Sequence, residues 1–310
     1  MATTPNGDQA CAACGAAGLT PHFSVRGGIG EEGLIPTPKN VGTALGDIVR
    51  CPACGHMQLD RFPSEEELDA EYVKAASDEY VEEEEGQRAS AALLMEKVER
   101  YASPGRLVDV GCWVGLYMAA AEDRGWETVG IEPSTYASEH ARRELGLDVR
   151  TDSLFTADIE AGSFDVVLLG DVLEHLTRAG DALEHLATWI KPGGVLVVLL
   201  PDAGSRVARG LGKRWWSVIP THIHYFTRHS AAAMLRRHGY EPLYVGTDPK
   251  AFTWRYYLNK GGVYLPGLSR RLVAIAERLG FADRVFVPDF GDRMVMIARP
   301  CGPGRTGRCS

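Results

Sequence analysis

Four of the seven cysteines stand in two Cys-x-x-Cys-Gly pairs, which are separated by 36 residues. Each pair tends to form a tight turn that presents two thiolates to one ion, so the two pairs supply the four sulfur ligands of a closed, tetrahedral zinc site. Such an ion has no open position for water or substrate, and we therefore expect it to serve folding rather than catalysis. A redox pair and an iron–sulfur site are the alternatives. The predicted zinc ligands are Cys11, Cys14, Cys51 and Cys54.

A glycine-containing loop, Gly111-Cys112-Trp113-Val114-Gly115, follows a strand-like run that ends at Val110. Two glycines between a strand and a helix let a nucleotide approach the backbone without a clash with Cβ atoms. Glu132 ends the next strand-like run, where an acidic side chain can accept hydrogen bonds from both ribose hydroxyls. The loop lacks the G-x-G-x-x-G spacing of nicotinamide sites, which disfavours an NAD-dependent oxidoreductase.

A segment rich in aromatic and histidine side chains, Trp215–Phe226, follows a later strand-like run. Histidine has a pKa near 6.5, and a positioned base accelerates a reaction that needs proton transfer by about 10²–10⁴-fold. We predict His222 as the first candidate base, His224 as the second and Tyr225 as a donor to a developing oxyanion. The alternatives are a packed aromatic loop with hydrogen-bonded histidines, or a metal held by His222 and His224, for which no third ligand is evident.

Short β-rich runs alternate with helical segments from Arg106 onward. The most apolar runs barely alternate between apolar and polar residues, as expected for strands that are covered on both faces. This rhythm predicts an α/β fold with a doubly wound, mostly parallel sheet that binds its ligand at the carboxyl ends of its strands. The expected strands are 107–110, 128–131, 147–150, 164–169, 195–200, 241–245 and 293–298, and the expected helices are 90–101, 116–124, 135–145, 180–190, 230–238 and 269–279.

Five motifs stand in a fixed order along this α/β region. They are Leu107–Gly115, Gly130-Ile131-Glu132-Pro133-Ser134, Ser163–Val167, Asp171-Val172-Leu173-Glu174-His175-Leu176 and Lys191-Pro192-Gly193-Gly194. In this order and spacing they resemble the class I methyltransferases that use S-adenosylmethionine (SAM). The resemblance covers about residues 106–239 and implies a Rossmann-like methyltransferase sheet of seven strands.

The resemblance also implies roles for individual residues. Asp109 would lie near the ammonium group of SAM, Gly111 and Gly115 would bound the loop beneath the cofactor, and Glu132 would hold the ribose. Residues after the third strand would contact the adenine, and residues at the end of the fourth strand would lie beside the methionine part. The predicted cofactor-binding residues are Asp109, Gly111, Cys112, Trp113, Gly115, Glu132, Pro133, Asp152, Ser153, Leu154, Gly170, Asp171, Val172 and His175.

One residue departs from the family pattern, because Trp113 stands where the family usually has a glycine. We expect that a tryptophan does not easily share the glycine backbone conformation, and that it either caps the cofactor or substrate or reshapes the pocket. His175 has two interpretations, a structural residue beside the cofactor or a group that faces the active site. We do not favour Glu174 and His175 as a metal-binding pair, because adjacent residues of a helix point in different directions.

The segment Cys51–Asp60, followed by a Pro-Ser-Glu-Glu-Glu-Leu helix start, resembles a zinc-binding domain. That domain precedes the methyltransferase core in a bacterial group that includes sugar C-methyltransferases of natural-product pathways. In those enzymes Tyr-x-Glu-His precedes a Tyr-Phe pair, and here Ile219–His222 keeps only the histidine. We expect a zinc-binding module at 1–62, a helical linker at 63–104, a SAM-dependent methyltransferase domain at 105–300 and a disordered tail at 301–310.

The chain of 310 residues has a net charge of −8, from 33 basic and 41 acidic side chains. An acidic surface repels nucleic-acid phosphates, so we expect a small-molecule methyl acceptor, a secondary metabolite or sugar intermediate, methylated at carbon or oxygen. Neither a secretory signal nor an apolar run of membrane length is evident, which predicts a cytoplasmic protein without a membrane partner. The alternatives are an RNA methyltransferase with a zinc module, a SAM-binding enzyme that does not methylate, and a scaffold. The sequence identifies neither the acceptor nor the oligomeric state.

Overall fold

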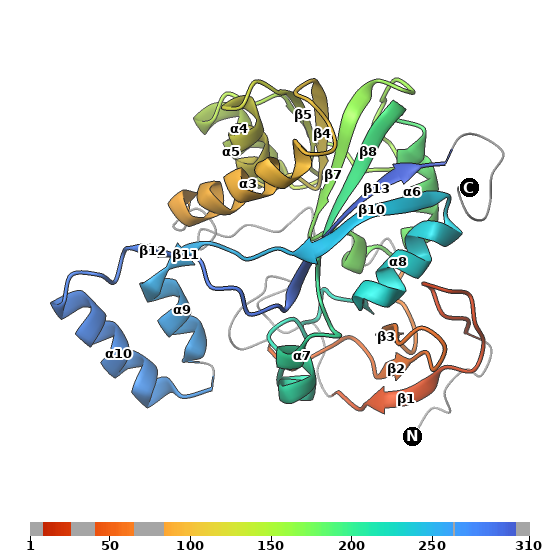
Figure 1. Ribbon diagram of the computed structural model, residues 1–310. Coiled ribbons are helices and arrows are strands. Elements are labelled where there is room, and N and C mark those ends of the chain that lie inside the picture. Colours follow the sequence, from red (N-terminus) through yellow and green to blue (C-terminus); the bar gives the residue numbers. More distant parts are fainter. Residues whose placement is uncertain (1–8, 26–40, 65–83, 263, 302–310) are drawn as a thin grey trace.

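The computed structural model describes residues 9–25, 41–64, 84–262 and 264–301. Its largest element is a seven-stranded sheet in the order β10-β13-β8-β7-β4-β5-β6 (Figure 1). The strands from β8 to β6 run parallel, and β13 runs antiparallel to both of its neighbours. These strands are β4 (Arg106–Val110), β5 (Glu127–Ile131), β6 (Val149–Arg150), β7 (Phe164–Gly170), β8 (Ile190–Pro201), β10 (Tyr240–Thr247) and β13 (Arg293–Pro300). The predicted doubly wound, mostly parallel sheet of seven strands is confirmed.

Helices alternate with these strands along the chain, and all of them except 206–211 and 254–261 lie where the sequence predicts a helix. Four of them begin at side chains that cap the helix, which are Ser134, Ser205, Thr227 and Thr253. The Ser134 hydroxyl accepts from the backbone N–H of Ala137, and Thr227 and Ser230 form a capping box. The helices are α3 (Glu84–Val98), α4 (Leu116–Glu122), α5 (Thr135–Glu144), α6 (Ala179–Ala187), α7 (Arg206–Leu211), α8 (Arg228–Arg237), α9 (Trp254–Gly261) and α10 (Pro266–Arg278), with 3₁₀ turns at η2 (Leu173–His175) and η3 (Gly212–Arg214).

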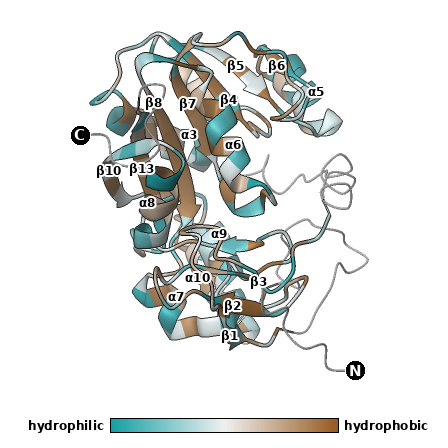
Figure 2. Cartoon of the chain, turned by 90° about the vertical axis from the view of Figure 1, so that its right-hand side faces the viewer, coloured by the Kyte–Doolittle hydropathy of each residue, from teal (hydrophilic) through white to brown (hydrophobic). Residues whose placement is uncertain are grey.

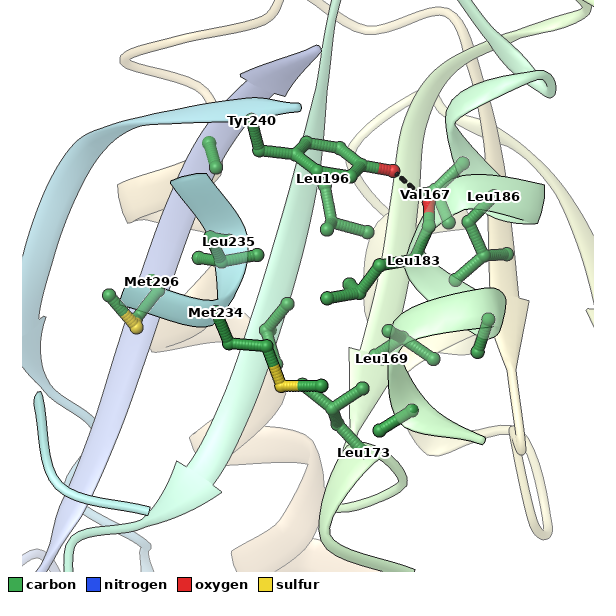
Figure 3. Close-up of a cluster of buried hydrophobic side chains, with 14 of the residues drawn as sticks. Val167, Leu169, Leu173, Leu183, Leu186, Leu196, Met234, Leu235, Tyr240 and Met296 are labelled. Carbon is green, nitrogen blue, oxygen red and sulfur yellow. Dashed lines mark hydrogen bonds between the residues drawn. The ribbon is translucent and has the colours of Figure 1, made fainter. Parts of the chain in front are cut away.

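The central strands β7 and β8 are buried on both faces, which explains their continuous apolar sequences (Figure 2). Because successive strand residues point to opposite sides, each face has its own apolar layer. On one face Val167 and Leu196 pack with residues of α6 and α8. Figure 3 shows this layer, in which the Tyr240 hydroxyl donates to the carbonyl of Leu183 at 2.7 Å. The polar end of a buried ring is thereby satisfied.

The opposite face is covered by α3 and α4. Leu94, Met95 and Val98 of α3 are fully buried against alternate residues of β7, β8 and β13. This helix falls in the region that we expected to be a linker, and its side chains contribute to the core of the sheet. Residues 65–83 of that region, and tail residues 302–310, lie outside the described residues.

A second, four-stranded sheet joins the N-terminal segment to the middle of the chain (Figure 1). Its order is β1 (Thr20–Phe23), β2 (Ile48–Arg50), β3 (Met57–Leu59) and β9 (His224–Tyr225). The last strand belongs to the histidine-rich segment that follows β8. All pairings are antiparallel, and Gln58 lies opposite His224. The N-terminal module is therefore hydrogen-bonded directly to the segment that carries the candidate bases.

An insertion between β10 and β13 carries α9, α10 and a two-stranded ribbon of β11 (Phe252–Thr253) and β12 (Val285–Phe286). In Figure 1 it extends to one side of the large sheet. The ring of Trp254 stacks on Phe286 with centroids 4.1 Å apart, which holds the ribbon to the start of α9. The start of α9 also brings aromatic side chains to the edge of the site described next.

Candidate active site

A cavity of about 920 Å³ opens at the carboxyl ends of the parallel strands. This is the edge at which an open α/β sheet binds its ligand, and the volume suits a cofactor together with a small molecule. The wall is formed by the strand ends of β4, β5, β7 and β8, by η2, by the segment before β9 and by the insertion. Lining residues that the sequence predicted are Gly111, Cys112, Trp113, Glu132, Pro133, Asp152, Ser153, Leu154, Gly170, Asp171, Val172, His175 and His222.

The loop after β4 depends on its two glycines. Gly111 has φ +71°, and a Cβ there would lie 2.6 Å from Cγ2 of Val172. Gly115 has φ +82°, and a Cβ there would lie 2.4 Å from Cδ1 of Leu147. A side chain at either position would therefore clash with a neighbouring side chain and strain the backbone. Gly111 lines the cavity, whereas Gly115 lies behind it as the N-cap of α4.

Trp113 overturns our expectation about the backbone of this loop. Its φ is +50°, so the tryptophan does adopt the left-handed conformation that suits a glycine. Its backbone N–H donates to Oε2 of Glu132 at 2.9 Å, and its ring lies 6.4 Å from the ring of Tyr136. A hydrogen bond to a carboxylate thus helps to hold a backbone conformation that a residue with a side chain seldom adopts.

Glu132 is buried at the end of β5, and both of its carboxylate oxygens accept backbone hydrogen bonds. Oε2 accepts from Trp113, and Oε1 accepts from Ser134 at 2.8 Å. Burial raises the pKa of Glu132, while these two hydrogen bonds act in the opposite direction. The side chain is therefore fixed at the cavity wall, with lone pairs left to accept from a ligand.

Asp109 lies one layer deeper than we expected. It is only 1% exposed and does not line the cavity, although Val110 and Gly111 beside it do. Neither of its carboxyl oxygens has a hydrogen-bond partner within the described residues. Burial, with a smaller contribution from Glu132, raises the pKa of Asp109 to about 8. The carboxyl is therefore largely protonated at neutral pH in the protein without ligand.

Asp171, directly after β7, has a left-handed φ of +58° and lies between two cations. Its carboxylate accepts from Nζ of Lys250 at 2.9 Å and from the guanidinium of Arg293. Burial opposes its ionisation, but the two cations outweigh that effect and hold its pKa well below the ordinary range. The family resemblance drew attention to Asp171, whereas Lys250 and Arg293 come from distant strand ends and were missed.

The turn η2 brings Glu174 and His175 to the cavity, where His222 meets them. One ligand atom from each of the three side chains lies within 4.8 Å of the other two. Our argument that Glu174 and His175 point in different directions is therefore wrong for this 3₁₀ turn. The sequence showed no further ligand for a metal site at His222, and the fold brings Glu174 and His175, which precede it by 48 and 47 positions, close to its ring.

The two ring nitrogens of His222 have different surroundings. Nδ1 lies 2.8 Å from the carbonyl of Ser217, and Nε2 lies 3.9 Å from Oε1 of Glu174. Burial and the nearby His175 lower the pKa of His222 well below its ordinary value. The ring is therefore neutral at pH 7, with its proton on Nδ1 and a lone pair on Nε2.

The other two candidate catalytic residues do not line the cavity. His224 lies in β9, with Nδ1 3.2 Å from Nε2 of His56 and Nε2 3.1 Å from the carbonyl of Leu176. Tyr225, also in β9, is buried among apolar residues. His222 precedes β9 and lies beside Glu174, whereas His224 contacts His56 and the carbonyl of Leu176, so the two histidines do not converge on one ion.

The four paired cysteines come together as the sequence predicts. The sulfur atoms of Cys11 and Cys54 lie 3.6 Å apart, as do those of Cys14 and Cys51. Four thiolates at about 2.3 Å from a common tetrahedral ion lie roughly 3.8 Å apart, so the group has the size of a zinc site. In each turn the glycine takes a left-handed φ, and its N–H donates to the carbonyl of the first cysteine.

Among the described residues, no helix combines the length and apolar character needed to cross a membrane.

Comparisons with known proteins agree with this geometry. Residues 83–245 match the family model described as a methyltransferase domain. The ubiquinone biosynthesis O-methyltransferase of Bradyrhizobium sp. (strain ORS 278) is 35% identical over 98 residues, which are 30% of this chain and 38% of that protein. The corresponding protein of Nitrobacter winogradskyi is 32% identical over 96 residues, 29% of this chain and 36% of that one. The chain therefore matches less than two fifths of the length of these relatives.

Among solved structures, the chain is similar to one in the complex between the Haloferax volcanii Trm112 methyltransferase activator and a methyltransferase. The TM-score is 0.50 at 15% identity, over 70% of this chain and 93% of that one. At this identity the likeness concerns the fold, and it agrees with a Rossmann-like methyltransferase sheet.

Proposed function

This chain belongs to the methyltransferase domain family, and from that premise we propose that it transfers the methyl group of SAM to a hydroxyl oxygen of a small molecule. One observation carries the proposal: a single cavity connects the loop at Gly111 and Glu132 with a second wall that contains His222. Methyl transfer needs such a continuous space, because the acceptor atom must reach the methyl carbon directly. Positioning the two reactants in this way supplies much of the rate acceleration.

The residues of the first wall fit SAM. Gly111 lines the cavity with its backbone, and the absence of a Cβ there leaves room for the side chain of Val172. The fixed carboxylate of Glu132 has lone pairs for two ribose hydroxyls. Asp152 and Leu154 line the part of the cavity where we expect the adenine. When bound, SAM supplies an electrophilic methyl group on a sulfonium sulfur.

The residues of the second wall suit an uncharged or weakly acidic acceptor. Aromatic side chains from two separate segments line it, including Trp216, Tyr256 and Tyr257. Flat aromatic surfaces favour a flat or partly unsaturated molecule. The neutral ring of His222 has a lone pair on Nε2 and can accept the proton of the acceptor hydroxyl. Asp171 is already neutralised by two cations, which leaves it less suited to that task.

Oxygen is our preferred acceptor atom because the curated relatives are named as O-methyltransferases. Carbon methylation of a sugar intermediate in a natural-product pathway is the second candidate. The observation in its favour is the N-terminal cysteine module, which resembles the module of sugar C-methyltransferases. The mass and fragmentation of the product distinguish the two.

We also propose that the four cysteines bind a structural zinc ion. The support is the convergence of four thiols at the separation that a tetrahedral ion requires.

Two measurements test the proposed reaction. Calorimetry should detect the binding of S-adenosylhomocysteine but not of NAD, and mass spectrometry should detect a mass gain of one methylene group in hydroxylated acceptors such as catechols. The variant His222→Asn should lower kcat/KM by about 10²–10⁴-fold, because the acceptor proton loses its acceptor group. Its affinity for S-adenosylhomocysteine should stay within about threefold, since His222 belongs to the other wall.

The matched control is His229→Asn, at an exposed position of α8. It should keep full activity. Unchanged activity in the His222 variant would remove this residue from the mechanism, and binding of NAD without S-adenosylhomocysteine would remove methyl transfer.

A further inference from the structure

We infer that Glu174, His175 and His222 form a binding site for a divalent first-row transition-metal ion that receives the oxygen of the acceptor. The site is separate from the four cysteines, and it rests on the proposed function only for the identity of the acceptor. Its protein ligands would be two imidazoles and one carboxylate, and its open side would face the cavity that all three residues line.

Glu174 is the observation that points to a cation. The side chain is 1% exposed, and neither carboxylate oxygen has a hydrogen-bond partner in the described part of the chain. The polar atom paired with it in the structure is Nε2 of His222, at 3.9 Å from Oε1, which is beyond hydrogen-bond distance. A buried carboxylate without a partner is costly, and such groups are normally paired with a cation or coordinate a metal.

The two histidines are oriented as metal-binding histidines are. Nδ1 of His222 lies 2.8 Å from the carbonyl of Ser217, and Nδ1 of His175 lies 2.8 Å from the carbonyl of Thr221. The Ser217 carbonyl fixes the proton of His222 on Nδ1 and increases the basicity of Nε2, which then binds the ion. His175 also hydrogen-bonds to the backbone of Asp171, and its ring would complete the ligand set. Both carbonyls belong to the loop of residues 217–222, so one short segment sets both rings.

The distances leave room for an ion. Two ligand atoms at about 2.1 Å from a common centre lie at most about 4.2 Å apart. The separation of 3.9 Å between His222 and Glu174 meets that limit. The other separations are within 4.8 Å, and small shifts of the side chains would close the difference. The rings of the two histidines are 4.7 Å apart at 72°, so they approach the centre from different directions.

The ligand set selects the class of ion. Two imidazoles with one carboxylate suit manganese, iron, cobalt or zinc, whereas magnesium and calcium prefer a shell made of oxygen. Three protein ligands leave at least one position open toward the cavity. A hydroxyl that reaches an ion there has a lowered pKa and releases its proton to water. The lone pair of His222 is then used by the ion, which replaces the histidine as the activating group.

Manganese binding to the full-length protein tests the inference directly, without any turnover. Mn²⁺ prefers oxygen and nitrogen ligands, so it leaves the thiolate site unaffected. Titration followed by electron paramagnetic resonance should find one tightly bound equivalent in the wild-type protein. Glu174→Gln and His222→Asn should each weaken that binding on the order of 100-fold. Where the protein already holds an ion, elemental analysis should find two metal ions per chain in the wild type and one in either variant.

A second Glu–His pair of this chain provides the matched control. Glu184 and His238 form an ion pair at 2.9 Å outside the cavity, so Glu184→Gln removes a similar carboxylate and should leave manganese binding unchanged. Affinity for S-adenosylhomocysteine, measured on the same samples, checks that each variant is folded. Wild-type protein that binds S-adenosylhomocysteine but no second metal ion overturns the inference and leaves the proposed function intact. A wild-type protein that binds the second metal ion but does not transfer a methyl group would support the inference and overturn the proposed function.

Discussion

The two walls of the cavity are constructed in different ways. The first wall, which we propose for SAM and call the cofactor wall, is made from consecutive strand ends between Val110 and Leu154. Its central acid, Glu132, accepts hydrogen bonds from the backbone N–H groups of Trp113 and Ser134. The second wall, which we propose for the methyl acceptor and call the acceptor wall, contains Glu174, His222 and Arg293 from three distant parts of the chain. Glu174 is buried there without a hydrogen-bond partner among the described residues. The first wall is therefore complete in itself, whereas the second has the features of a site that a ligand completes.

The supports of the two walls differ as well. The segment that carries His222 continues into β9, which pairs with β3 of the cysteine module. Leu59 of that module also donates to the carbonyl of Ile223, the residue after His222, at 3.0 Å. The cofactor wall rests on the large parallel sheet instead. This comparison implies that the module determines the position of the acceptor rather than the affinity for the cofactor.

Loss of the cysteine site should affect the acceptor wall selectively. Cys51→Ser removes one thiolate next to β3 and should disturb the β3–β9 pairing. We expect kcat/KM for the acceptor to fall on the order of 100-fold, since a displacement of about 1 Å at a reacting group has that cost. Affinity for S-adenosylhomocysteine should change less than about threefold. Steady-state kinetics and calorimetry on the same samples, with their zinc content measured, check this. An equal loss in kcat/KM and in affinity for S-adenosylhomocysteine would mean that the cysteine module stabilises both walls.

A change in the cofactor wall should mainly lower the affinity for S-adenosylhomocysteine. Glu132→Gln keeps the shape of the side chain but removes its negative charge. The amide has one oxygen, so it cannot accept hydrogen bonds from Trp113 and Ser134 on two separate oxygens. Hydrogen bonds to a charged group contribute about 1.5–3 kcal/mol, so affinity for S-adenosylhomocysteine should fall roughly 10- to 150-fold.

The control lies on the same strand. Glu127→Gln alters the exposed start of β5, where the glutamate side chain is 69% exposed, and should leave the affinity unchanged. Calorimetry that finds the same affinity for Glu132→Gln as for the wild type would remove the ribose-binding role of Glu132.

A further prediction concerns the dependence of stability on pH. Burial raises the pKa of Asp109 to about 8 in the folded protein, whereas an aspartate in the unfolded chain has a pKa near 4. Between these two values the folded protein keeps a proton on Asp109 that the unfolded chain releases. This contribution to stability is complete below pH 4 and is lost as the pH rises through about 8. Asp109→Asn should therefore stabilise the ligand-free protein increasingly over that range, by at most about 1.4 kcal/mol per pH unit.

Thermal unfolding at a series of pH values measures this difference. Asp123→Asn, at a position where the side chain is 76% exposed, is the control, and its unfolding temperature should change with pH as that of the wild type does. A constant difference between Asp109→Asn and the wild type from pH 4 to pH 8 would contradict the assignment.

Local patterns predicted most of the fold and the cofactor wall. Apolar runs and capping residues located the strands and helices, and Gly111, Gly115 and Glu132 were identified because each follows directly from its own strand. The backbone of Trp113 was predicted wrongly, because its left-handed φ is held by a carboxylate 19 residues away rather than by a local preference. Asp109 was expected near the cofactor, and only the packing reveals that it lies behind the cavity wall.

The sequence by itself therefore determined the parallel sheet, the glycine loop, the position of Glu132 at the end of β5 and the four-cysteine set, since each depends on residues of fixed spacing within one or two elements. The tertiary structure alone decided that Glu174 and His175 meet His222, that His224 turns away toward His56, and that β3 supports the acceptor wall. The physical reason is that these contacts join residues far apart in the chain. Their positions follow from how the sheets pack together, which no local periodicity records.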